Sequence, residues 1–240
     1  MDYLIFTAIV MLGLFVQSFA GFAGSLITIP LYSIFFIPKN IIPAHSLLML
    51  VSNIILVIEA RKHLQWKKII KMQIAGLFGV PVGAYCLAYL PSDIIRIGIS
   101  IITLIFGILF LFNVNVRLKE NNVTQGTVGL LSGFLGGSIS ESGPPVVIYG
   151  LSRGWPKEIF RINLLAYFLA LSVMGNLSYL CLGLFNTGTL KLSATALIPA
   201  IIACWCGTKV KDLVGEGHFK KIIITIIFVV ASIGLLKVFL

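Results

Sequence analysis

The stretch Gly136 to Pro145, with the sequence GGSISESGPP, interrupts an otherwise apolar segment with glycine, serine and one glutamate. The chain around it is strongly hydrophobic: of 240 residues, 58% are apolar and 11% are charged, and the mean hydropathy is +1.05. Soluble domains carry about 25% charged residues, so we expect lipid to surround most of this chain. In hydrocarbon, non-helical backbone is tolerated only where it is buried in protein or lines a wet cavity. This stretch therefore predicts a cavity inside a membrane protein.

The chain repeats itself. Three features of the first half recur in the same order in the second half. Gly21-Phe22-Ala23-Gly24 corresponds to Gly133-Phe134-Leu135-Gly136, and Pro30 corresponds to Pro144. Gly83 followed by Arg96 corresponds to Gly207 followed by Lys220, at the same interval. The stretch NVNVRLKENNVTQ at 113–125 is the most polar in the protein and indicates a boundary. We predict two membrane repeats, residues 1–114 and 124–240, joined by a linker loop at 115–123.

Each half is predicted to hold one glycine-interrupted segment followed by three long apolar helices. The expected helices are 43–60, 69–89 and 93–113 in the first half, and 157–184, 190–213 and 217–240 in the second. The fold class is therefore an all-α integral membrane protein. The interrupted segment either crosses the membrane or turns back at its glycines, and the two choices place different loops on the same side.

The distribution of basic residues favours the segment that turns back. A single crossing divides the 18 Lys and Arg residues nine to nine, whereas a reversal divides them 14 to 4. The four basic residues on the less basic side are Lys39, Arg96, Lys191 and Lys237. By the positive-inside rule we expect two inverted repeats, each with a re-entrant glycine-rich helical hairpin and three transmembrane helices. Both termini would lie outside and the basic loops in the cytoplasm.

The hairpin tips, 21–30 and 136–145, are expected to meet near the midplane and to bind a small oxyanion. Ser142 is the expected N-cap and Pro144 a first-turn residue of the outgoing helix. Unpaired N–H groups, serine hydroxyls and the helix dipole would together attract the anion. The candidate substrate-binding residues at the tips are Gly21, Gly24, Ser25, Thr28, Gly136, Gly137, Ser138, Ser140, Ser142 and Gly143. The alternative is that these small residues only let helices pack closely.

Polar residues on the long helices extend this candidate site. Ser46 and Asn53 share one helical face, as do Asn163 and Tyr167, and we expect these four to face the bundle interior and contact substrate. Interhelical hydrogen bonds are the alternative. His45, near the outer end of its helix, is expected to lie in water.

Glu141 is the only acidic residue placed deep in an apolar region, which makes it a functional candidate. Desolvation and a neighbouring anion would both favour its protonated form, so proton and anion could move together. Alternatively, Glu141 points away from the site, where it is protonated or hydrogen-bonded to nearby serines, or it lies in water at the rim.

Two rival classes to an anion-binding membrane protein are an intramembrane enzyme and a structural membrane subunit, in which mutations at the hairpin tips would leave all solute fluxes unchanged. An intramembrane enzyme would need a nucleophile with a base or a metal cluster, and Cys204-Trp205-Cys206 lacks metal-ligand spacing and companions. We therefore expect no enzyme, no metal and no cofactor. The excess of 18 basic over 8 acidic residues comes without a basic run interleaved with aromatics, so no nucleic-acid partner is expected. The expected partners are a small anionic substrate and the lipid bilayer, and a homo-oligomer is compatible with this interpretation.

A constellation of short motifs resembles the sulfite exporter TauE/SafE family over nearly the full length. The motifs are the paired glycine-rich segments, Ala44-His45-Ser46, the basic loop Arg61 to Lys71 with Trp66, Ser132-Gly133 with Gly143-Pro144-Pro145, and Phe160-Arg161. The resemblance implies an inner-membrane secondary transporter for sulfite, thiosulfate or organosulfonates such as sulfoacetate, driven by the proton gradient. A passive small-anion channel on the same site is the alternative. Before Gly143-Pro144-Pro145, where mainly glycine and apolar residues are expected, this chain has Ser138, Ser140, Glu141 and Ser142, which leaves the particular anion open.

Overall fold

The computed structural model describes residues 2–111 and 118–210, and this part of the chain is entirely helical apart from its loops. The helices are α1 (Asp2–Ala20), α2 (Gly24–Phe35), α3 (Pro38–Ala60), α4 (Ile70–Tyr89), α5 (Ser92–Leu111), α6 (Asn122–Ile139), α7 (Gly143–Ser152), α8 (Lys157–Cys181) and α9 (Thr187–Val210). Two 3-10 turns, Arg61–His63 and Trp66–Lys68, lie between α3 and α4. The predicted helix 217–240, the ends of 93–113 and 190–213, and residues 115–117 of the linker lie outside the described residues.

Six of these helices, α1, α3, α4, α5, α8 and α9, are long and apolar enough to cross a membrane. Helices form here because lipid offers no hydrogen-bond partners, so each segment must pair its own N–H and C=O groups. Large apolar side chains remain exposed on the bundle surface, for example Phe78 and Val82 on α4 and Ile97 and Ile101 on α5. These faces fit a lipid environment. The all-α, multi-pass membrane class predicted from composition is confirmed.

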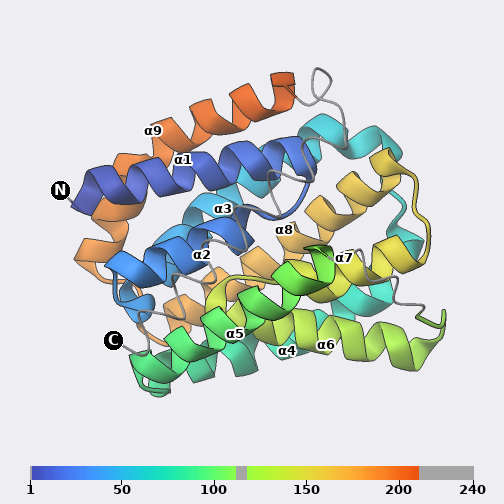
Figure 1. The fold of residues 1–240 in the computed structure, drawn as a ribbon, viewed down its shortest axis with the longest axis horizontal. Helices are drawn as coiled ribbons and strands as arrows, with labels where there is room; N and C mark the ends of the chain where they lie inside the picture. Colours follow the sequence, from blue (N-terminus) through green and yellow to red (C-terminus); the bar gives the residue numbers. More distant parts are fainter. Residues whose placement is uncertain (1, 112–117, 211–240) are drawn as a thin grey trace.

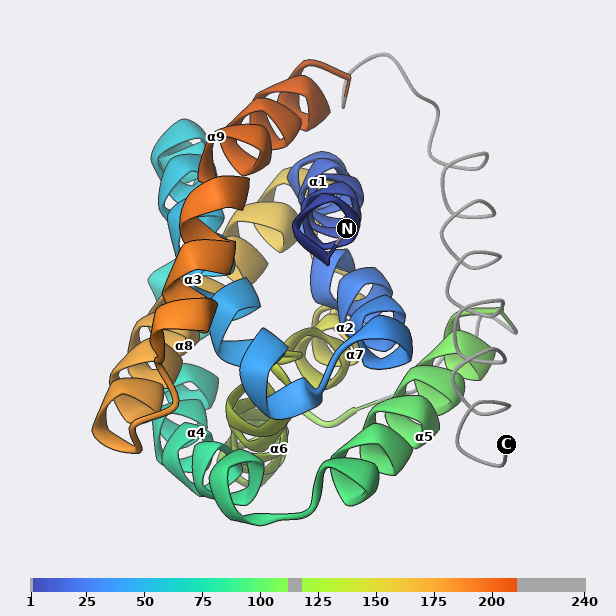
Figure 2. The ribbon, with the colours of Figure 1, turned by 90° about the vertical axis from the view of Figure 1, so that its left-hand side faces the viewer.

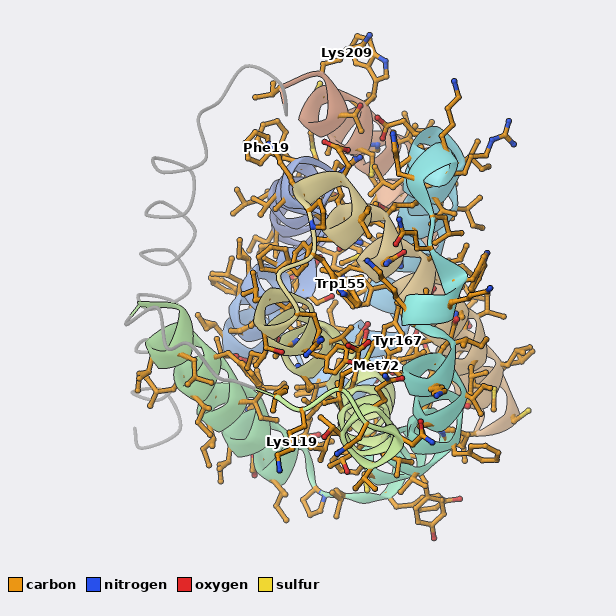
Figure 3. All side chains as sticks on the ribbon, turned by 90° about the vertical axis from the view of Figure 1, so that its right-hand side faces the viewer. Phe19, Met72, Lys119, Trp155, Tyr167 and Lys209 are labelled. Atoms are coloured by element: carbon orange, nitrogen blue, oxygen red, sulfur yellow. The ribbon has the colours of Figure 1, made fainter. Side chains whose placement is uncertain are left out.

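The helices lie roughly side by side along the long axis of the molecule (Figure 1). The N-terminus and the loops α2–α3, α4–α5 and α8–α9 lie at its left end, and the loops α3–α4 and α7–α8 lie at the right end. Figure 3 looks onto the right end, where Lys119, Trp155 and Lys209 are labelled. Gly13 of α1 packs against Thr28 of α2, and Gln17 of α1 packs against Gly24 of α2. These contacts show that the chain reverses direction after α1. Helices α1 and α2 are therefore antiparallel.

The tightest packing joins α4 to α6 through a row of glycines that we call the glycine seam: Gly76, Gly79, Gly83, Gly129, Gly133 and Gly137. Gly133 lies directly on the backbone of Gly76, and Gly137 lies on the carbonyl of Val80. No side chain fits between these backbones, which is the usual device for close helix association in lipid. For Gly137 the structure thus gives a packing role.

Both breaks are short and lie within the predicted hairpin tips, 21–30 and 136–145. Non-helical backbone is confined to Gly21–Ala23 and Ser140–Ser142. Other residues of the tips, such as Thr28 and Gly136, are helical, because each residue that joins a helix pairs its backbone groups without water. The chain makes each reversal with left-handed backbone, at Gly21 (φ 80°) and Ala23 (φ 71°) in the first break and Ser140 (φ 56°) in the second.

Candidate functional site

A cavity of about 50 Å³ lies where α2 and α7 begin. In Figure 2, which looks along the bundle, these two helices lie near the middle of the view, with α3 and α8 beside them. The residues around the cavity are Gln17, Phe22, Ala23, Gly24, Ser25, Leu26, Ser46, Met49, Asn53, Gly136, Ser140, Glu141, Ser142, Gly143, Phe168, Leu171, Ser172 and Gly175. This space is well above the roughly 10–15 Å³ that a single water needs, so it has room for a small oxyanion.

One wall of the cavity is the start of α2. Its N-terminal neighbour Ala23 is left-handed and makes no side-chain capping bond, and Gly24 and Ser25 follow as the first helical residues. The first N–H groups of a helix have no partner within the helix. Both residues line the cavity, so this uncapped helix start lies at its edge.

The facing wall is the start of α7. Ser142 occupies the N-cap position and a proline stands in the first turn, as predicted, but the Ser142 side chain makes no capping hydrogen bond. The Ser142 carbonyl instead accepts from the hydroxyl of Ser132 in α6, which holds the turn in place. Ser140, Ser142 and Gly143 line the cavity. A second uncapped helix start therefore meets the same space.

Two helix starts at one cavity create a favourable place for negative charge. Each start carries about half a positive charge. The first turn of α2 adds N–H donors that no side chain occupies, whereas in the first turn of α7 Pro144 and Pro145 have no N–H and Gly143 provides the donor. Serine hydroxyls from both hairpins, including Ser25 and Ser140, add further donors. The arrangement can hold a small anion without a lysine or arginine in the wall.

Glu141 lies in the same wall and is 1% exposed. Neither of its carboxyl oxygens has a hydrogen-bond partner in the described part of the chain. Two of the alternatives for this residue, a wet rim and a hydrogen bond to nearby serines, are therefore wrong. A buried carboxylate without a partner would be an uncompensated charge, which a protonated carboxyl is not.

Amides from three long helices support the cavity from the α1, α3 and α8 side. Gln17 donates from its Nε2 to Asn53 Oδ1 at 2.8 Å, which ties α1 to α3. Asn176 donates from its Nδ2 to Ser46 Oγ at 3.1 Å, which ties α8 to α3. Ser46 and Asn53 line the cavity as expected, and they also make the interhelical bonds that were the alternative.

Several cavity residues did not emerge from the sequence. Gln17 and Ser172 are polar, and the isolated amide in the first apolar helix is a signal that could have identified Gln17. The apolar part of the wall also includes Phe168 and Leu171, and nothing in an apolar helix distinguishes such residues from lipid-facing ones.

Six of the predicted residues lie away from the cavity: Gly21, Thr28, Gly137, Ser138, Asn163 and Tyr167. Gly21 packs against Arg161, and Gly137 belongs to the glycine seam. The Ser138 hydroxyl donates back to the Phe134 carbonyl. The last two are buried in the bundle, where Asn163 Oδ1 accepts from the Gln65 N–H at 3.0 Å and the Tyr167 hydroxyl donates to the Gly129 carbonyl at 3.4 Å.

Two charged or titratable residues are more deeply placed than expected. His45 is fully buried rather than in water, because α2 folds over this part of α3. Arg161 is 5% exposed, and it donates from its Nη2 to the Ser18 carbonyl at 3.0 Å and to Glu59 Oε2 at 3.1 Å. It therefore satisfies a carbonyl in the last turn of α1 and joins that helix end to α3 and α8.

Comparison with known families gives one match. The model of the family described as "Sulfite exporter TauE/SafE" matches residues 5–233. No curated protein matches the chain. No solved structure matches it either. The family match covers both hairpins, the cavity and nearly the whole length, in agreement with the resemblance of the sequence motifs. The chain belongs to the sulfite exporter TauE/SafE family.

Proposed function

We propose that the protein is a secondary transporter that moves a small sulfur-containing anion, such as sulfite, thiosulfate or sulfoacetate, across the bacterial inner membrane. The observation that carries this function is the meeting of two uncapped helix starts at one small cavity. Helix starts of this kind hold anionic groups in membrane carriers built from discontinuous helices. The family description adds sulfite as the kind of cargo.

The same proposal includes an inverted topology, with repeats at 1–114 and 124–240. Helices α2 and α7 have 12 and 10 residues. At about 1.5 Å per residue they reach roughly 18 Å and 15 Å, short of a hydrocarbon core of about 30 Å. We therefore interpret α1–α2 and α6–α7 as re-entrant hairpins that enter from opposite ends of the bundle, in line with where their outer ends lie in Figure 1.

Matching contacts in the two halves support this interpretation. Gly83 of α4 packs against Phe134 of α6, and Gly207 of α9 packs against Phe15 of α1. Each helix thus packs onto the first hairpin helix of the other half, as a pseudo-two-fold relation requires. The basic loop after α3 and the loop after α7 would lie in the cytoplasm, and both termini outside.

Within this mechanism we assign proton coupling to Glu141. Its carboxyl group shares the cavity with the anion, and its protonated form removes the repulsion between two negative charges. A proton and an anion that occupy the cavity together carry less net charge through the low-dielectric part of the membrane. The eight other candidates that line the cavity would then act in binding: Gly24, Ser25, Ser46, Asn53, Gly136, Ser140, Ser142 and Gly143. A homo-oligomer is compatible with this mechanism.

Transport by purified protein in liposomes tests the function. Proteoliposomes with an imposed proton gradient should accumulate labelled sulfite, thiosulfate or sulfoacetate above the external concentration. Calorimetry on the detergent-purified protein should show binding of the same anion, with sulfate and simple carboxylates as comparisons. Flux that only equilibrates would indicate a passive channel, and absence of both binding and flux for every sulfur anion would contradict the function.

A further inference from the structure

His45 is a fully buried side chain behind Ser25 of the cavity wall. The proposed mode of anion binding gives this histidine no role. Its Nε2 lies 3.2 Å from Thr28 Oγ1 and 3.4 Å from Ser25 Oγ, both on α2. The ring of Tyr32 packs edge-on against the imidazole, with 5.5 Å between the two ring centroids. The second ring nitrogen, Nδ1, is buried and has no hydrogen-bond partner in the described part of the chain.

The different surroundings of Nε2 and Nδ1 indicate which ring nitrogen of His45 carries the proton. A neutral imidazole places its hydrogen on one nitrogen, and a charged imidazolium places one on each. Both forms with a hydrogen on Nδ1 would bury an N–H donor without an acceptor, which is rare and costly in folded proteins. A hydrogen on Nε2 instead points at two hydroxyl oxygens and leaves only a lone pair at Nδ1. The Nε2–H tautomer therefore fits the surroundings of His45.

The tautomer controls what Ser25 can offer the cavity. If Nε2 were an acceptor, the Ser25 hydroxyl could give its hydrogen to His45 and turn oxygen lone pairs toward the anion. If Nε2 is the donor, Ser25 Oγ accepts, and its own hydrogen is free to point into the cavity. Ser25 is half-buried and lines the cavity, so its hydrogen can reach a ligand there.

We propose that His45 is a positioning residue: as the Nε2–H tautomer it donates toward Thr28 and Ser25 and thereby turns the Ser25 hydroxyl into a donor for the bound anion. This role rests on the proposed function, because it acts through the anion in the cavity. It gives this histidine a task that needs neither a change of protonation nor direct contact with substrate.

Substitutions that place an amide at either ring nitrogen separate this role from packing. In His45→Gln the amide N–H₂ can reach the position of Nε2, whereas in His45→Asn it reaches only that of Nδ1. A hydrogen bond to a charged group contributes about 1.5 kcal/mol or more, which is at least about a tenfold change in affinity. We expect sulfite affinity, measured by calorimetry, to fall by at least about tenfold in His45→Asn and His45→Phe and to recover in His45→Gln.

The double variant of His45→Phe with Ser25→Ala tests the route through Ser25. Once the hydroxyl is absent, loss of His45 should cost no further affinity, so the two changes should be strongly non-additive. Additive losses, or equal affinity in the Gln and Asn variants, would contradict the positioning role even if every variant folds.

Nitrogen-15 spectra of histidine-labelled wild-type protein provide a readout that does not depend on transport. The signals that disappear in His45→Gln should show a protonated, pyrrole-type Nε2 and an unprotonated, pyridine-type Nδ1. A protonated Nδ1 would overturn the assignment. If wild-type protein binds neither sulfite, thiosulfate nor sulfoacetate, the proposed function fails and the role of Ser25 fails with it, while the spectrum still decides the tautomer.

Discussion

Replacement of Gly133 by alanine should destabilise the protein, whereas the same replacement at Gly126 on the same helix should not. A Cβ atom at Gly133 would overlap the Gly76 carbonyl oxygen and lie 2.7 Å from the Gly76 carbonyl carbon. A Cβ atom at Gly126 would have no heavy atom within 4 Å. The two substitutions add the same methyl group to α6, so they differ only in what the methyl meets.

The size of the effect follows from these distances. Non-bonded carbons sit at about 3.5–4.0 Å, so α4 and α6 would have to separate locally by roughly 1 Å. Forcing a methyl into a packed interface costs about 1–3 kcal/mol, and α4 cannot give way by a rotamer change because the obstacle is backbone. At Gly126 only the gain in helix propensity remains, up to about 1 kcal/mol in favour of alanine.

Thermal unfolding of both variants in the same detergent, followed by intrinsic tryptophan fluorescence, measures the difference. For a chain of this length, about 2–4 °C of Tm corresponds to 1 kcal/mol, so Gly133→Ala should lower Tm by about 2–12 °C. Gly126→Ala should leave Tm unchanged or slightly higher. Equal Tm values for the two variants would refute the close backbone contact between α4 and α6.

Three further predictions concern topology and transport. A single cysteine in place of Lys67 should be labelled by an impermeant reagent only from the cytoplasm and one in place of Lys191 only from outside; labelling from the same face would exclude the inverted repeat. Gly136→Leu should abolish anion binding, since a Cβ there already lies 3.1 Å from Ser142 Cβ beside the cavity, whereas Gly98→Leu, which meets nothing within 4 Å, should bind normally; wild-type affinity in Gly136→Leu would assign that glycine to packing. Glu141→Gln should still bind and exchange anion, with little dependence on pH, but should not accumulate it against a gradient, and accumulation with the wild-type pH profile would place the proton elsewhere.

Much of the fold could be predicted from the sequence because lipid imposes simple rules. Five of the predicted long helices correspond to α3, α4, α5, α8 and α9, and the ends that lie within the described residues differ by a few residues. Hydropathy identifies such helices because a crossing needs a long apolar segment with internally paired backbone. The breaks lie within the predicted hairpin tips, but their exact ends could not be predicted, since glycine and serine also occur inside helices that pack closely.

The sequence also located the hairpin part of the site, because residues next to a break stay near it in space. Gly24, Ser25, Ser140, Ser142 and Gly143 could be predicted at the cavity for this reason. The residues contributed by long helices were harder to predict. Asn163 has the same polar character as Asn53, yet only Asn53 reaches the cavity.

The sequence by itself determined that this is a polytopic helical membrane protein with two glycine-marked breaks, because composition and hydropathy act residue by residue. Only the tertiary structure decided which polar faces meet. It brings Gln17 and Ser172 to one cavity and buries His45 behind Ser25. It also lets Arg161 donate to the Ser18 carbonyl in the last turn of α1. The helical period fixes which residues of one helix share a face. The rotation and tilt that bring this face to a particular neighbour come from packing between helices, and here from backbone contacts at the glycines of α4 and α6.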